Sequence, residues 1–360
     1  MVLSHIIVVF CYRLQLEYDY EDIIYPIPFN VLYYNKSSHY VSFGEVNPIF
    51  PSYVLTGDLP ECNNQYSDKM FITAASSNHA YGSFNLMYSI LLANPYASIL
   101  YIDLKISQQL LRILSSHFVT LRQIQEKMRS NGYLAYRKYN WHNFPEWMNL
   151  FKNKVQRGGY SWKVIPMVDA FFEWKGLFSW LDAGDLIIDG IEREFTLARK
   201  YGFFSPPSPG RIGNWTYYKT IDFLKEYNMI SHVNNTDPNC NANSIFIDYS
   251  KPYTHEMMRK HEECAYTQKC IAPRGSTMKN HRQDQAVLST LINDYKIPMA
   301  MKRNFHPALR NENAKVQTLY NLVITIMQEY HIQLNNTYYD YSSIQYKQTP
   351  ISYSSRTLDY

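Results

Sequence analysis

The sequence lacks the signatures of several common functional classes. No Cys-x-x-Cys pair occurs among the five cysteines, which argues against a structural zinc site. A Gly-x-Ser-x-Gly elbow and a Walker-type glycine loop are both missing, so the usual marks of a serine hydrolase and of a P-loop nucleotidase are absent. The 35 Lys and Arg residues form no basic stripe on a predicted face, which makes nucleic acid a poor candidate partner.

A long hydrophobic run is also missing. Residues 1–13 contain only a short apolar core, far below the roughly 20 residues that span a bilayer. This core fits a weak signal peptide, the remnant of a signal anchor or a plain first strand equally well. We interpret residues 1–69 as an N-terminal apolar segment and irregular stem, and residues 311–360 as a C-terminal helix and Tyr-rich tail.

Between these ends, strand and helix patterns alternate along the chain. The 360 residues, 46% of them hydrophobic, suffice for one large domain with extensions. Alternation of this kind predicts an α/β fold with right-handed crossovers and a mostly parallel sheet. Strands are predicted at 71–75, 97–102, near 133–139, at 177–181 and 244–248, with a strand broken by prolines at 201–207. Helices are predicted at 84–92, 110–114, 123–130, 164–174, 191–200, 214–227 and from 286 onward.

The apolar run 177–181 ends at Asp182, and Asp185 follows after Gly184. The run is typical of a strand covered on both faces, and open α/β sheets bind ligands outside the carboxyl ends of their strands. Two carboxylates at that edge suit a divalent cation whose other positions are filled by phosphate or water. A helix cap or a simple turn would explain the same spacing.

Three further stretches are candidates for chemistry. Lys163 lies at the start of the helix 164–174, whose N-terminus could also face a diphosphate, although a solvated lysine fits the local sequence too. Residues 239–243 place amides before a strand, where they could hold sugar hydroxyls or form a turn. The polar run 280–285 opens an apolar helix and is difficult to explain by packing alone.

Taken in order, these motifs resemble a eukaryotic family grouped with the nucleotide-diphospho-sugar transferases. The matching segments are Thr73–His79, Tyr160–Lys163, Trp180–Gly184, Cys240–Ala242 and His281–Gln285. The resemblance extends over residues 71–307, so we expect the transferase-like domain at 70–310. It implies a Rossmann-like GT-A fold, with a mostly parallel central sheet flanked by helices.

The resemblance also implies roles for single residues. It implies that Asp182 and Asp185 hold a divalent cation, Mn²⁺ or Mg²⁺, against the diphosphate, and that Asp284 and Gln285 form the catalytic pair on the acceptor side. The residues that it places at the nucleotide or donor are Ser76, Asn78, Lys163, Asp182, Asn241, His281 and Arg282. The chain departs from the usual Asp-x-Asp motif, because its second carboxylate comes one residue late.

The implied function is transfer of a sugar, of the hexosyltransferase type, from a nucleotide-sugar donor to a hydroxyl of a glycan, protein or lipid. One alternative is a catalytically degenerate GT-A-fold binding protein that keeps the pocket and lacks turnover. Another is a different α/β enzyme, such as a hydrolase.

Transferases of this kind usually work in the Golgi or endoplasmic reticulum lumen, where an N-terminal tether would hold the protein at the membrane. In that oxidising compartment we expect a disulfide between Cys264 and Cys270. Cys62 could meet Cys240, although the sequence leaves this pairing open. Four sequons would matter only in a secreted glycoprotein; they lie at Asn35, Asn214, Asn234 and Asn335.

Overall fold

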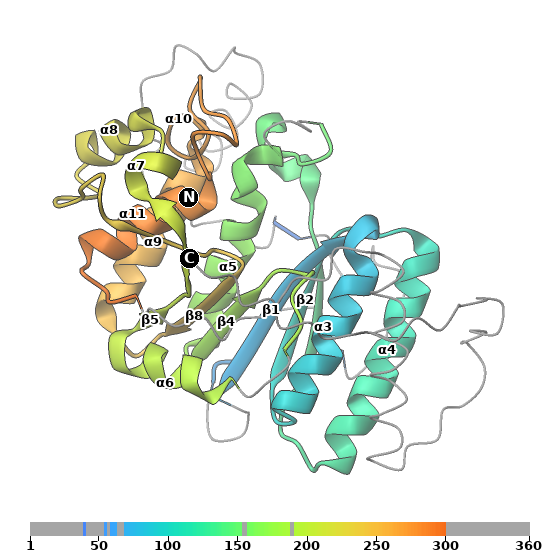
Figure 1. Ribbon diagram of the computed structural model, residues 1–360. Coiled ribbons are helices and arrows are strands. Elements are labelled where there is room, and N and C mark those ends of the chain that lie inside the picture. The colour runs from blue at the N-terminus through green and yellow to red at the C-terminus, as the bar shows by residue number, and fades with distance from the viewer. Residues whose placement is uncertain are drawn as a thin grey trace, which may run out of the picture.

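The computed structural model describes residues 39–40, 54–55, 58–62, 68–152, 157–187 and 191–299. The predictions for residues 1–38 and 311–360 lie outside these described residues. The described residues form an α/β structure in which helices pack on both faces of a central sheet (Figure 1). The predicted α/β class is confirmed.

The central sheet has six strands in the order β3-β2-β1-β4-β8-β5. Neighbours among β1 to β4 run parallel, whereas β8 is antiparallel to both β4 and β5, so the sheet is mostly parallel as predicted. A separate two-stranded sheet pairs β6 with β7. The strands are β1 Lys69–Ser76, β2 Ser98–Lys105, β3 Leu134–Lys138, β4 Leu177–Leu181, β5 Phe203–Phe204, β6 Pro207–Arg211, β7 Pro238–Cys240 and β8 Ser244–Asp248.

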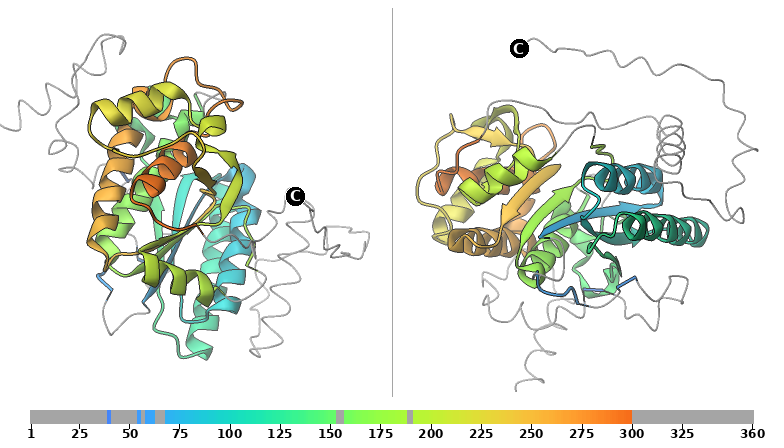
Figure 2. Two further views of the ribbon diagram at one scale, coloured as in Figure 1. Left: turned by 60° about the vertical axis from the view of Figure 1, so that its left-hand side comes forward. Right: turned by 90° about the horizontal axis from the view of Figure 1, so that it is seen from below.

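The helices divide between two cores, one on each face of the central sheet. Residues of α3, α4 and α6 share one core with one side of the strands, and residues of α5, α9 and α11 share the other core with the opposite side. Figure 2 shows α3 and α4 lying side by side. The α-helices are α3 Ala80–Ala93, α4 Gln108–Lys127, α5 Ser161–Trp174, α6 Glu192–Tyr201, α7 Ile212–Trp215, α8 Tyr218–Glu226, α9 Pro252–Tyr266, α10 Gln268–Ile271 and α11 Asp284–Asp294. Short 3-10 helices are η3 Ser77–His79, η4 Trp141–Asn143, η5 Glu146–Met148 and η6 Arg157–Tyr160.

Strand β1 explains why the sequence shows continuous apolar runs and not a polar–apolar alternation. Met70 and Ile72 pack into the α5 core, whereas Phe71 and Ala75 pack into the α3 core. Because successive side chains of a strand point to opposite faces, a strand covered on both faces needs apolar residues at every position.

Two helix predictions were wrong in extent. The polar segment 123–130 is largely the C-terminal part of the long helix α4, because Phe118, Leu121 and Ile124 continue its buried stripe. The predicted helix 214–227 is divided into α7 and α8, since the backbone between them is extended at Thr216. None of the described helices is long and apolar enough to cross a membrane.

Candidate functional site

The carboxyl ends of β1, β2 and β4 meet at one edge of the sheet, as their parallel pairing requires. Ser76 ends β1, Asp103 lies near the end of β2, and Asp182 directly follows β4. Asp103 serves the local structure, because its Oδ1 accepts hydrogen bonds from the Lys105 and Ile106 backbone N–H groups at 2.8 and 2.6 Å. All three residues therefore lie on one edge of the sheet.

The acidic stretch after β4 forms a tight turn. The backbone N–H of Asp185 donates to the carbonyl of Asp182 at 2.8 Å, and the N–H of Asp182 donates to the carbonyl of Asn243 at 2.9 Å. Helix α3 approaches the turn closely at Gly82, where an added Cβ would lie 2.6 Å from the carbonyl oxygen of Ala183. A glycine is therefore needed at position 82 for the turn to lie where it does.

Lys163 connects three segments that are far apart in the sequence. Its Nζ lies 3.0 Å from Asp182 Oδ1, 3.4 Å from Asp284 Oδ2 and 2.5 Å from the carbonyl oxygen of Ala242. Burial alone would lower the pKa of Lys163, but the carboxylates of Asp182 and Asp284 outweigh burial and raise it. The buried lysine therefore stays positively charged between two acidic residues.

Trp180 supports this arrangement and was missed in the sequence. Its Nε1–H donates to Asp182 Oδ1 at 2.7 Å, and the centroid of its ring lies 5.4 Å from Lys163 Nζ. Residues at positions i and i+2 of an extended segment have side chains on the same face. The spacing of Trp180 and Asp182 was therefore the sequence signal for their contact.

Asp284 begins α11 directly after a backbone in an unusual conformation. Gln283 has φ 49° and ψ −116°, a combination that is costly for any residue with a Cβ, by about 1–3 kcal/mol. Such strain persists only where the surrounding structure holds it. Burial raises the pKa of Asp284 to about 6, with Lys163 opposing the rise and Asp182 adding to it. A carboxyl group titrating near 6 suits proton transfer close to neutral pH.

Asp185 is the second carboxyl of the turn, and only 2% of the residue is exposed. Its Oδ2 accepts a hydrogen bond from Ser244 Oγ at 3.3 Å. Burial, together with the negative charge of Asp182, raises the pKa of Asp185. The carboxylate oxygens of Asp182 and Asp185 are hard donors of the kind that Mn²⁺ or Mg²⁺ takes. Over the described ranges no group of three or more His, Cys, Asp or Glu side chains could hold a metal, so further ligands would have to be phosphate and water.

Two predicted donor-binding segments lie at the rim of this site. Asn241 precedes the Ala242 carbonyl that contacts Lys163, and its Oδ1 accepts a hydrogen bond from the Asn243 N–H at 3.1 Å, as a turn former would. Ser76 Oγ donates to Asn78 Oδ1 at 2.5 Å, with Asn78 exposed just beyond the end of β1. Both segments lie on the edge of the sheet that carries Asp182.

His281, which the resemblance places at the donor, has both ring nitrogens hydrogen-bonded within the protein. Its Nε2–H donates to the carbonyl of Ile271 at 2.9 Å, and its Nδ1 accepts the backbone N–H of Tyr217 at 3.2 Å. Burial lowers the pKa of His281 to about 4, although the bond to Ile271 opposes this. Both nitrogens of the neutral ring are hydrogen-bonded, and these bonds join the loop after α10 to the start of α8. The neighbouring Arg282 is only partly buried, and its guanidinium Cζ lies 4.2 Å from the Trp215 ring centroid.

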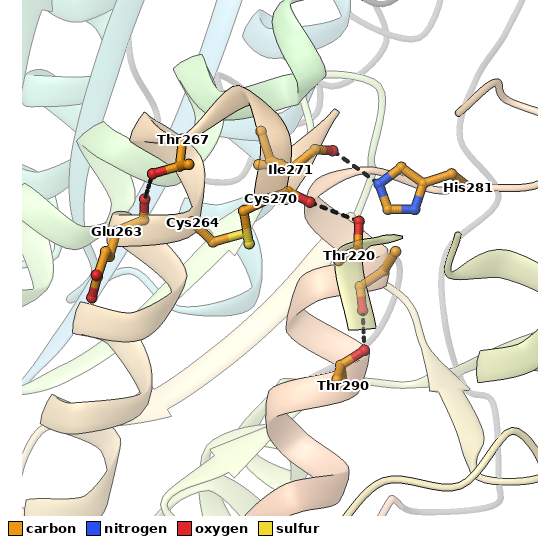
Figure 3. Close-up of a disulfide and its surroundings, with 9 residues drawn as sticks. Thr220, Glu263, Cys264, Thr267, Cys270, Ile271, His281 and Thr290 are labelled. Carbon is orange, nitrogen blue, oxygen red and sulfur yellow. Dashed lines mark hydrogen bonds between the residues drawn. A yellow bond between two sulfur atoms is a disulfide. The ribbon is translucent and has the colours of Figure 1, made fainter. Parts of the chain in front are cut away.

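The expected disulfide between Cys264 and Cys270 is present, with the two Cα atoms 5.2 Å apart (Figure 3). It links the end of α9 to α10, and the carbonyl of Cys270 accepts a hydrogen bond from Thr220 Oγ1 of α8 at 2.7 Å. The next carbonyl is the one that receives His281 (Figure 3). The disulfide therefore stabilises the loop that leads into Asp284. Cys62 and Cys240 form no disulfide with each other.

Of three comparisons with known proteins, one finds similar chains. No family model matches the chain, and a search of curated proteins finds no relative. Among solved structures, the galactosyltransferase LgtC with donor and acceptor sugar analogues aligns with a TM-score of 0.43 and 14% identity, over 71% of this chain and 95% of that chain. The S. cerevisiae mannosyltransferase Ktr4p in complex with GDP gives 0.41 and 12%, over 81% and 82%.

The apo WbbM bifunctional glycosyltransferase gives a TM-score of 0.42 and 11% identity, over 74% of this chain. The match spans 46% of the WbbM chain. All three of these proteins are glycosyltransferases. Because the scores and identities are low, we base the function of this chain on the site itself.

Proposed function

We propose that this protein is a glycosyltransferase that moves a sugar from a nucleotide-sugar donor to a hydroxyl acceptor. The observation that carries the proposal is the contact of Lys163 with both Asp182 and Asp284 at the carboxyl edge of the sheet. This edge is where open α/β sheets bind nucleotides. The charged Lys163 lies between two carboxylates. The half-exposed Asp182 would face the donor, and the buried Asp284 is the ionisable group for the acceptor.

The donor loses a nucleoside diphosphate, so the site must stabilise negative charge that develops on the leaving group. Asp182 and Asp185 are the residues that would hold Mn²⁺ or Mg²⁺, and the cation would supply charge stabilisation at the diphosphate. Lys163 keeps its positive charge in a buried position, where electrostatic interactions are stronger than in water. Its ammonium donates a hydrogen bond to Asp182 Oδ1 and holds that carboxylate in place.

Asp284 and Gln285 are proposed to act on the acceptor side of the donor sugar. Deprotonated Asp284 would accept a hydrogen bond from the attacking hydroxyl and orient it, as positioned carboxylates do in general base catalysis. Its raised pKa means that this form dominates only above about pH 6. Gln285, partly exposed at the first turn of α11, offers an amide to a sugar hydroxyl.

The disulfide supports a secretory location, because disulfides persist in oxidising compartments and are rare in the cytosol. We therefore propose the Golgi or endoplasmic reticulum lumen, with residues 70–310 as the transferase domain and a membrane tether N-terminal to it. Expression through the secretory pathway, followed by fractionation and by alkylation of unpaired thiols, tests the location. Recovery of a reduced protein from the cytosol alone would contradict it.

The function is tested with a panel of nucleotide sugars and nucleoside diphosphates, with and without Mn²⁺. A ligand that binds only the folded state raises the unfolding temperature, and turnover releases the nucleoside diphosphate. We expect one base to stabilise the protein and Lys163→Met and Asp284→Asn to abolish release. Lys127→Met on α4 and Glu226→Gln on α8 change the same charges at exposed positions and serve as controls. The binding-protein alternative predicts stabilisation by the ligand without release.

A further inference from the structure

We infer that the acceptor carries an anionic group on a sugar, and that it is bound by a surface beside Asp284 made of Tyr217, Tyr218, Lys219, Arg274 and Arg282. This acceptor surface deepens the proposed transferase function and rests on it. It joins the start of α8 to the loop between α10 and α11. Lys219 Nζ lies 3.4 Å from the carbonyl oxygen of Arg274, which fixes the two segments side by side.

Arg282 is held by an aromatic ring and not by a carboxylate. Its guanidinium Cζ lies 4.2 Å from the Trp215 ring centroid, and its backbone N–H donates to the carbonyl of Trp215 at 2.9 Å. The indole is in turn fixed by a 2.9 Å hydrogen bond from Nε1 to the carbonyl of Pro209. Its other close neighbour is Gly210, which has φ +89° and leaves no room for a side chain against the indole. The arrangement orients a guanidinium whose donors are suited to a carboxylate, sulfate or phosphate.

Two tyrosines directly precede Lys219 in the chain and supply aromatic rings to this surface. Tyr218 is 58% exposed, and its ring centroid lies 4.7 Å from that of Tyr217 at an interplanar angle of 56°. Tyr217 is positioned by Gly275, which has φ +95° and where an added Cβ would lie 2.7 Å from the Tyr217 hydroxyl. Exposed rings with a polar end pack against the C–H face of a sugar and bind its hydroxyls.

The charge of the surface favours an anionic acceptor. Lys219 is exposed, Arg282 is partly exposed, and neither belongs to an ion pair among the residues that the structure describes. Asp222, exposed one turn along α8, is the acidic residue closest to Lys219 in the sequence. These two cations therefore favour a ligand that supplies negative charge, as complementary surfaces generally do.

The acceptor surface continues directly into the proposed catalytic site. Arg282 precedes Asp284 by two residues, so their Cα atoms are at most about 7.6 Å apart. His281, next to Arg282, accepts the backbone N–H of Tyr217. A sugar resting on the tyrosines with its anionic group at Arg282 would therefore lie within reach of Asp284.

The test is acceptor kinetics with four matched glycosides: a neutral hexoside, its uronic acid, its sulfate and its phosphate. We expect at least one anionic form to have a KM ten-fold or more below that of the neutral form. Arg282→Gln, Lys219→Gln and Tyr218→Ala should each raise the acceptor KM several-fold at unchanged donor KM, and the two charge variants should also remove the preference. Arg193→Gln on α6 is the matched control, since it removes an exposed cation elsewhere and should change neither KM.

Equal KM values for neutral and anionic glycosides would overturn the inference. A rise of the donor KM in Arg282→Gln would also overturn it, since Arg282 would then belong to the diphosphate site. Release of no nucleoside diphosphate from any donor would instead contradict the proposed function. In that case, calorimetric titration of the four glycosides into the wild-type protein and Arg282→Gln tests the surface by itself, and equal binding by the two proteins rejects it.

Discussion

Lys163 on α5 and Asp284 on α11 come from distant parts of the chain, yet the ammonium of one lies 3.4 Å from the carboxylate of the other. Asp182 meets the same ammonium from the end of β4. The contact joins the half of the molecule that the proposal assigns to the donor to the half that it assigns to the acceptor. The following predictions test what each part of this junction contributes.

Replacing Lys163 should destabilise the protein as well as inactivate it. In Lys163→Met the buried carboxyl of Asp284 loses its cation, and removing one partner of a buried pair costs about 3–5 kcal/mol. Asp182 is half exposed, so water compensates part of its lost interaction. We therefore expect Lys163→Met to lower the free energy of unfolding, measured with urea, by about 3 kcal/mol. Lys127→Met, on the exposed face of α4, should change the unfolding free energy little. Equal stabilities of the two variants would show that Lys163 is not paired as described.

Stability should fall as the pH rises from about 4 to about 6. The pKa of Asp284 is about 6 in the folded protein, above that of an unfolded aspartate, so the folded state binds more protons in this window. The raised pKa of Asp185 adds to the slope with the same sign. The contribution of Asp284 is about 3 kcal/mol, present below pH 4 and lost above pH 6.

Asp284→Asn resembles the protonated carboxyl and should flatten this dependence, as measured by denaturant unfolding at several pH values. Glu226→Gln is the control, since Glu226 is exposed on α8. A wild-type stability that instead rises between pH 4 and pH 6 would contradict the buried, proton-binding state of Asp284.

Breaking the disulfide should loosen the loop that positions α11. Closing so short a loop is worth about 2 kcal/mol, so Cys264→Ala and Cys270→Ala should each lose about that much. The double variant should lose no more than either single variant, because both single variants already remove the same bond. Alkylation with and without reductant provides the measurement of thiol state. Alkylation of Cys264 and Cys270 themselves without reductant would show that the bond does not form.

Gly82→Ala should displace the acidic turn without touching any charge. The new methyl group would lie 2.6 Å from the carbonyl of Ala183, closer than packed atoms allow, at a cost of about 1–3 kcal/mol. We expect weaker Mn²⁺-dependent stabilisation by the nucleoside diphosphate, measured by thermal shift. Ala93→Ser, at the partly exposed end of the same helix, is the control. Unchanged ligand binding in Gly82→Ala would separate the turn from the donor site.

Sequence patterns predicted the sheet well because its strands are buried on both faces and end at recognisable polar residues. The apolar run that stops at Asp182 fixed both a strand and the edge to which the site belongs. The division of α7 from α8 could not be predicted, since it depends on the distant Arg282 N–H bonding the carbonyl of Trp215. The same holds for the structural role of His281, whose two partners come from other segments.

The site residues were predicted as separate candidates, and the structure brings Lys163, Asp182 and Asp284 together. Their pairing was not predictable, because it requires α5 and α11 to pack on the same face of the sheet. The backbone strain at Gln283 has no sequence signal either, since glutamine has no preference for positive φ.

The most direct test of the central claim is nucleoside diphosphate release from nucleotide sugars by purified wild-type protein and by Asp284→Asn. The account predicts release with one donor, stimulated by Mn²⁺ or Mg²⁺ and by an acceptor, and reduced at least 100-fold in Asp284→Asn while nucleoside diphosphate binding persists. Release that proceeds equally in both proteins, or binding without release across the whole donor panel, would contradict it.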